Sequence, residues 1–118
     1  MKILIVDDDK TTRKILTLYL RGKDHTVITA ENGLDALEKI GIETVDVIIA
    51  DLNMPYMDGI ELTRTIRSDS SRSHIPIIMV SIEEDAEERD RAVEAGVSAY
   101  LVKPVTAEQV EESIRNMR

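Results

Sequence analysis

Five short apolar runs recur along the chain, and each has the length of a β-strand. They occupy residues 3–6, 27–30, 47–50, 75–80 and 99–102. Between them, apolar residues recur every three or four positions, which is the spacing of an amphipathic helix. The first, third and fourth runs are almost uniformly apolar, as strands covered on both faces of a parallel sheet are. The alternation predicts a (βα)5 chain folded as a doubly wound, five-stranded parallel sheet of the α/β class.

Several residues between the apolar runs are typical helix ends. Asn32 precedes the second helical segment, and Gly96 is a typical stop for the fourth. Capping-box patterns occur at residues 58–61, 81–84 and 106–109. The second strand mixes polar with apolar residues and the fifth is short, so we expect both at the edges of the sheet.

The fourth helical segment, residues 83–95, has an unusually thin apolar stripe. Its apolar residues are Ala86, Ala92, Val93 and Ala95, set among acidic residues and two arginines. Such a stripe holds a helix weakly to its sheet. The segment is therefore either a well-solvated helix or an element that moves.

Composition narrows the classes of function. The 118 residues carry 15 Lys and Arg against 23 Asp and Glu, a net charge of −8, which disfavours direct binding to nucleic acid or to anionic membranes. The chain has no cysteine, and its two histidines, His25 and His74, are far apart, which disfavours a zinc site. No apolar run approaches the roughly 20 residues of a membrane span. We expect one cytoplasmic domain over residues 1–118.

Polar side chains follow four of the predicted strands at their carboxyl ends. They are Asp7, Asp8 and Asp9 after the first strand, Asp51 after the third, Ser81 after the fourth and Lys103 after the fifth. In an open parallel sheet, ligands bind beyond these ends, where the strand order reverses. Crowded carboxylates need a cation, and with no usable His or Cys ligand a hard ion such as Mg²⁺ or Mn²⁺ fits. Because Asp can accept a phosphoryl group while Lys and Ser hold its oxygens, the set predicts phosphoryl transfer to an Asp.

Each of these residues also has a purely structural explanation. The acidic run at residues 7–9 can stabilise the start of the next helix through its dipole, and Ser81 can cap the helix that follows it. Lys103 can be an ordinary solvated side chain, and Asp51 can simply begin a loop. Their joint placement at one edge of four strands favours the chemical interpretation over the structural one.

Four stretches of the chain resemble the receiver domains of two-component response regulators. They read ILIVDD at residues 3–8, DLNMPYMDG at 51–59, PIIMVS at 76–81 and GVSAYLVKP at 96–104. The similarity extends over essentially all 118 residues. It implies a flavodoxin-like three-layer sandwich with strand order 2-1-3-4-5. It also implies a signalling switch that accepts a phosphoryl group from the phosphohistidine of a sensor histidine kinase or a phosphotransfer domain.

The resemblance assigns the acidic residues to specific roles. Asp51 is then the phosphoacceptor. Asp8 and Asp51 bind Mg²⁺ directly, with Mn²⁺ as a substitute, and the backbone carbonyl of Asn53 is a third ligand. Asp7 acts on the metal through water. Asp9 is expected to cap the first helix, since three consecutive residues cannot all point into one crevice.

Further family positions coincide with residues at the ends of the last two strands. Ser81 and Tyr100 match the switch pair that carries the signal to the surface. Lys103 matches the phosphate-binding lysine, and the Lys103–Pro104 bond is expected to be cis. The pattern is closest to chemotaxis-type single-domain regulators, and residues 97–99 lack the acidic side chains of receivers that dimerise. We expect a monomer before phosphorylation. The output is expected through a partner or an appended output domain, and the sequence leaves open which.

Two positions depart from the family pattern. Ile82 is bulky where a small residue is usual, so we expect it to lie beside the phosphate, slowing small donors and shielding the phosphoryl group from water. Val105 stands where Phe is frequent, and we expect this to affect packing only. The pair of Asn53 and Glu83 acts in the opposite direction, because in the family it accompanies rapid self-dephosphorylation.

Three other functions share some of these features. An Mg²⁺-dependent phosphatase with an Asp nucleophile has its nucleophile and its acid on one strand end, with a cap domain, and neither feature is evident here. A phosphate-independent interaction module would have lost part of the acidic set or the lysine, and both are intact. A flavodoxin needs a hydroxyl-rich loop after the first strand and aromatic residues, and only three Tyr are available. The preferred interpretation is therefore a phosphoacceptor domain, not an enzyme acting on other substrates.

Overall fold

The computed structural model describes residues 1–82 and 85–117. Five parallel strands form one sheet in the order β2-β1-β3-β4-β5, with β2 and β5 at the edges as predicted. The strands are β1 (Lys2–Val6), β2 (Thr26–Ala30), β3 (Val47–Asp51), β4 (Ile77–Ser81) and β5 (Ala99–Val102). β4 begins two residues later than predicted, because Pro76 has no N–H group to donate to the ladder. The predicted doubly wound architecture is confirmed.

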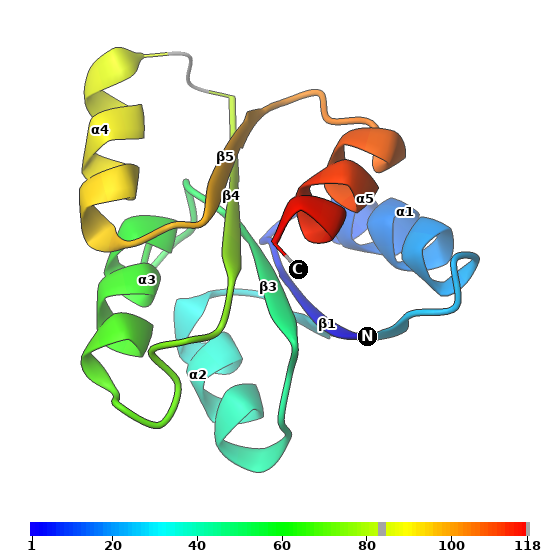
Figure 1. Ribbon diagram of the computed structural model, residues 1–118, viewed down its shortest axis with the longest axis horizontal. Helices are drawn as coiled ribbons and strands as arrows, with labels where there is room; N and C mark the ends of the chain where they lie inside the picture. Colours follow the sequence, from blue (N-terminus) through cyan, green and yellow to red (C-terminus); the bar gives the residue numbers. More distant parts are fainter. Residues whose placement is uncertain (83–84, 118) are drawn as a thin grey trace.

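In the described part of the chain, one helix follows each strand, and these five helices cover both faces of the sheet (Figure 1). They are α1 (Lys10–Arg21), α2 (Gly33–Ile42), α3 (Gly59–Ser68), α4 (Ala86–Ala95) and α5 (Ala107–Asn116). α1 and α5 pack on one face, and α2 and α3 pack on the other. None of the helices in the described part of the chain is long and apolar enough to cross a membrane.

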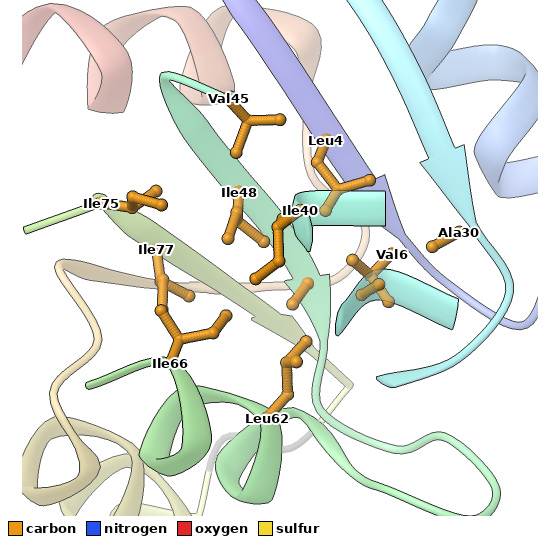
Figure 2. Packing of buried hydrophobic residues seen from close by; sticks show 12 residues of the cluster. Leu4, Val6, Ala30, Ile40, Val45, Ile48, Leu62, Ile66, Ile75 and Ile77 are labelled. Carbon is orange, nitrogen blue, oxygen red and sulfur yellow. The ribbon is translucent and has the colours of Figure 1, made fainter. Parts of the chain in front are cut away.

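The core is aliphatic, and successive strand residues point to opposite faces. In β1, Leu4 packs in the cluster beneath α2 and α3, whereas Ile5 packs beneath α1 and α5. Figure 2 shows the first cluster, in which Ile48 of β3 lies among side chains from the neighbouring strands and from α2 and α3. Because both faces are covered, β3 and β4 are buried along their whole length. Such strands are rigid supports for whatever follows them.

Helix starts agree with the sequence at four positions. Asp58, the first residue of the predicted pattern at 58–61, caps α3 by accepting from the backbone N–H of Glu61 at 2.8 Å. Asp9 caps α1 by accepting from the backbone N–H groups of Thr11 and Thr12. Asn32 caps α2, and Thr106 forms the full capping box of α5. These local signals are satisfied by residues within one turn of each other, which is why they could be identified without the fold.

One capping prediction is wrong. Ser81 is not the N-cap of α4: it is the last residue of β4, and its partner in β5 is Val102. Glu84, the other member of the predicted capping box, lies outside the described residues. α4 begins instead at Ala86, with Asp85 as its N-cap accepting from the N–H of Glu87 at 3.0 Å. Sheet pairing has extended the strand through the position where the local pattern alone would begin a helix.

The prediction that α4 packs on the sheet through few apolar side chains is confirmed. Only Ala92 and Ala95 are buried in this helix, and Val93 is 59% exposed. The helix ends at Gly96 as predicted, with a φ of 112°, in the left-handed region that glycine adopts without strain. Two small buried side chains stabilise α4 less than the larger aliphatic residues stabilise the other helices.

Candidate functional site

Three carboxylates meet at the carboxyl ends of β1 and β3. Each of Asp7, Asp8 and Asp51 offers an oxygen, and these oxygens lie within 4.8 Å of one another. The strands place them together because β1 and β3 are adjacent, with Val6 opposite Ala50 in the register. Asp7 is 4% and Asp51 is 7% exposed, whereas Asp8 is open to solvent. The sequence prediction that these residues converge is confirmed.

Lys103 follows the edge strand β5, and its side chain reaches this carboxylate cluster. Its Nζ is 3.1 Å from Asp51 Oδ1 and 3.4 Å from Asp7 Oδ2. Its backbone N–H donates to the carbonyl of Ser81 at 2.7 Å, which continues the β4–β5 ladder by one bond. The Lys103–Pro104 peptide bond is cis, as expected. The ammonium group lies within ion-pair distance of the two buried carboxylates.

The cluster contains more negative than positive charge, with three carboxyl groups and one ammonium. Burial, together with the charge of Asp7, raises the pKa of Asp51 from 3.8 to about 6, although Lys103 opposes the shift. Burial alone would lower the pKa of Lys103, but its contacts with Asp51 and Asp7 raise it. One ammonium does not neutralise three crowded carboxyls. An oxygen-coordinated cation with a small radius, such as Mg²⁺, fits this donor set, because the described site contains carboxylates and no His or Cys.

Ser81 and Tyr100 lie on the two strands beyond Asp51. Ser81 is fully buried at the end of β4, next to the strand that ends in Asp51. Tyr100 is partly buried against a small apolar cluster that contains Ala92 of α4. The guanidinium carbon of Arg89, also on α4, lies 5.3 Å from the centre of the Tyr100 ring. Tyr100 therefore contacts α4 in this structure.

Comparisons with known proteins identify the family. The model of the response regulator receiver domain matches residues 3–115. The chain belongs to the receiver domain family. This receiver domain is 40% identical over 118 residues to chemotaxis protein CheY of Pseudomonas aeruginosa, covering 99% of this chain and 95% of that protein. It is 41% identical over 116 residues to chemotaxis protein CheY-3 of Vibrio cholerae, covering 97% of this chain and 88% of that protein.

Solved structures agree with the family assignment. The chemotaxis protein CheY4 of Vibrio cholerae superimposes with a TM-score of 0.93 at 32% identity, covering 99% of this chain and 98% of that one. A receiver domain from Clostridium thermocellum gives a TM-score of 0.89 at 29% identity, covering 98% and 92% of the two chains. This receiver domain is therefore a phosphorylation-dependent switch of two-component signalling. Members of the family bind Mg²⁺ in an acidic pocket and interact with kinases and output partners.

The remaining predicted site residues of this receiver domain are more peripheral. Asn53 is exposed in the loop that follows β3. Ile82 lines a cavity together with Asp51, as its position suggested, but 69% of its surface is exposed. Glu83 lies outside the described residues. The carboxylates, Ser81 and Lys103 thus form the compact part of the site.

Two features of the receiver domain site had no signal in the sequence. Arg13 of α1 donates to the backbone carbonyl of Asp7 at 2.7 Å and so holds the turn that carries the acidic pair. A cavity next to Asp51 is lined by Ile15 and Val105, although Val105 was expected to affect packing only. Ile15 is 61% exposed, although the apolar spacing of α1 gives no reason to distinguish it from the buried Leu16 and Leu20. Both features depend on how α1 sits against other segments, which a periodic pattern does not determine.

Proposed function

We propose that residues 1–118 form one receiver domain that accepts a phosphoryl group on Asp51 from the phosphohistidine of a sensor histidine kinase or phosphotransfer domain. The main support is that Asp51 ends the buried strand β3 with its carboxylate 3.1 Å from the ammonium of Lys103. We propose that the domain is cytoplasmic and monomeric before phosphorylation. Its output partner is then neither a nucleic acid nor a membrane. The domain catalyses only its own phosphorylation and dephosphorylation.

Mg²⁺ is the proposed cofactor, and Mn²⁺ is expected to replace it. Asp8 and Asp51 would bind the ion directly with the backbone carbonyl of Asn53, while Asp7 would act through water. The support is the clustering of carboxylate oxygens within 4.8 Å. When bound, the ion supplies positive charge that neutralises the carboxylates and stabilises the charge of the transferring phosphoryl group.

In the proposed reaction, an oxygen of the Asp51 carboxylate attacks the phosphorus as the imidazole of the donor leaves. Lys103 would move from the carboxylates to a phosphoryl oxygen, and the Ser81 hydroxyl would donate to another. Ile82, whose side chain is exposed, is a proposed neighbour of the phosphoryl group, and so is Glu83. Because the contacts of Ser81 and Lys103 with the added oxygens would form only as the phosphoryl group is transferred, they would favour the phosphorylated state.

The test of this function is phosphorylation of the isolated chain. With acetyl phosphate and Mg²⁺, we expect the intact mass to increase by one phosphoryl group. Reduction of the acyl phosphate with borohydride, followed by peptide mapping, should locate the change at Asp51. EDTA should prevent the reaction. Labelling at any other residue, or none with Mg²⁺ present, would remove Asp51 as the phosphoacceptor.

Asp8→Ala is expected to weaken Mg²⁺ binding at least about tenfold, because Asp51 and one backbone carbonyl provide too few oxygens to replace the water around this ion. Isothermal titration of the unphosphorylated protein measures the affinity. Asp9→Ala is the matched control, since Asp9 caps α1 and is not part of the carboxylate cluster. It should lower helix stability without changing Mg²⁺ affinity by more than about twofold. Equal affinities of Asp8→Ala and wild type would exclude Asp8 as a ligand.

Phosphorylation is expected to change the surface formed by α4 and β5. The proposed switch draws Ser81 toward the phosphoryl group and repacks Tyr100, which contacts Arg89 of α4. Hydrogen exchange with beryllofluoride and Mg²⁺ should change by about tenfold, or ~1.4 kcal/mol, in α4 and β5. α2 should not change. A response confined to α1 and α2 would contradict the switch.

A further inference from the structure

A mostly apolar cavity opens beside Asp51, and the reaction described above does not use its apolar part. Its volume is about 450 Å³, within the roughly 300–1,000 Å³ typical of small-molecule sites. Asp7, Asp51 and Lys103 form one end. The rest of the lining is apolar apart from Thr12 of α1. The cavity thus has a charged end at the phosphoacceptor and an apolar body leading away from it.

The lining of the cavity includes both buried and exposed side chains. Its floor includes Ile5, Ile49 and Val80, which belong to the buried cluster beneath α1 and α5. Its rim includes the exposed side chains of Ile15 and Ile82. Because its lining extends into the buried cluster, the cavity suits a small molecule with an apolar tail better than the broad apolar face of a protein helix, which needs a shallow groove.

We propose that this cavity holds the apolar tail of an acyl phosphate, so that Asp51 takes phosphoryl groups preferentially from acyl phosphates with chains longer than acetyl. The inference rests on the proposed role of Asp51. The phosphate of such a donor lies at the Asp51–Lys103 end, and its hydrocarbon chain lies along Ile15 and Val105. Tail burial removes apolar surface from water and holds the donor at the acceptor carboxylate.

The phosphoryl transfer exchanges one phosphorus–oxygen bond for another. The bond between phosphorus and the donor's acyl oxygen breaks, and its electron pair leaves on the released carboxylate. The bond between phosphorus and an Asp51 oxygen forms, which gives an aspartyl phosphate. No oxidant, reductant or proton is consumed, and Lys103 stays protonated throughout.

A series of donors tests the preference. With Mg²⁺ present, the KM for phosphorylation should fall about threefold for each added methylene, and roughly tenfold from acetyl to butyryl phosphate. The gain should stop once the chain fills the cavity. Equal KM values for acetyl, butyryl and hexanoyl phosphate would overturn the inference while leaving Asp51 as the phosphoacceptor.

Filling the cavity should remove the preference. In Val105→Phe we expect the ratio of butyryl to acetyl phosphate efficiency to fall to within about twofold of one. Val93→Phe is the matched control, because Val93 is an exposed valine on α4 that does not line the cavity. It should retain the wild-type ratio. A full preference in Val105→Phe would show that the tail binds elsewhere and would overturn the assignment.

A binding measurement separates the cavity from the chemistry. With Mg²⁺, hexylphosphonate should shift the methyl NMR signals of Ile15 and Val105, whereas methylphosphonate should shift them much less. If no donor phosphorylates the protein, the proposed function fails, and this titration still decides whether the cavity binds an alkyl chain. Absence of any hexylphosphonate-specific shift would overturn the inference and leave the cavity to a side chain of a partner protein.

Discussion

Asp51→Asn is expected to abolish phosphoryl uptake and, at the same time, to stabilise the metal-free fold at neutral pH. The first effect follows because an amide is not a nucleophile toward phosphorus at this site. The second follows from the buried carboxyl, whose pKa is raised from 3.8 to about 6 by burial and by the charge of Asp7. In the folded protein, ionising Asp51 therefore costs free energy, and Asn removes this cost.

The sign of the pH dependence follows from proton binding. Between pH about 4 and about 6 the folded protein binds more protons at Asp51 than the unfolded chain does, so wild-type stability falls as pH rises through this window. The advantage of Asp51→Asn should thus be absent near pH 4 and complete near pH 7. In Asp51→Asn, Lys103 loses one of its two carboxylate partners, which offsets part of this advantage. We therefore expect the free energy of unfolding to rise by a net amount of about 1–2 kcal/mol.

Urea unfolding in EDTA at several pH values measures this gain. Asp90→Asn is the control, because it neutralises an exposed carboxyl on α4 far from the cluster. It should leave the shape of the pH profile unchanged. A gain for Asp51→Asn that is as large at pH about 4 as at pH about 7 would show that ionisation of Asp51 is not its cause.

The fold and the convergence of the site residues could both be predicted from the sequence. Uniformly apolar runs separated by helical patterns allow few arrangements other than a doubly wound parallel sheet. In such a sheet, the carboxyl ends of strands share one edge, so Asp7, Asp51 and Lys103 meet there although they are far apart in the chain. Caps such as Asp9 were also predictable, because each is satisfied within one helical turn.

The features that could not be predicted from the sequence are those in which long-range contacts compete with local patterns. Ser81 begins a capping-box pattern, yet pairing with β5 extends β4 through it. Ile15 follows the helical period of the core face, yet it lies at the rim of the cavity beside Asp51. The contact from Arg13 to the carbonyl of Asp7 depends on the angle at which α1 leaves the sheet. Periodicity gives the face of a helix but not its tilt.

Gly59→Ala is expected to destabilise the protein strongly, because α3 starts in contact with the backbone that carries Asp51. A Cβ at Gly59 would lie 2.5 Å from the carbonyl oxygen of Asp51, 2.6 Å from Met79 Sδ and 3.1 Å from the Cα of Leu52. The thioether can move, but two of these contacts are with backbone. The N–H of Gly59 also donates to the carbonyl of Leu52 at 2.8 Å, so α3 cannot retreat without breaking that bond.

Overpacking of this kind costs about 3 kcal/mol, which exceeds the ~1 kcal/mol that Ala gains over Gly in helix propensity. We expect Tm to fall by about 10 °C and phosphorylation to slow, since the strain acts on the backbone of the acceptor. Gly41→Ala is the matched control, because its Cβ would meet nothing within 4 Å at the end of α2. It should raise stability by about 0.5–1 kcal/mol. Equal Tm values for the two variants would show that α3 shifts freely and that its close approach to Asp51 is not required.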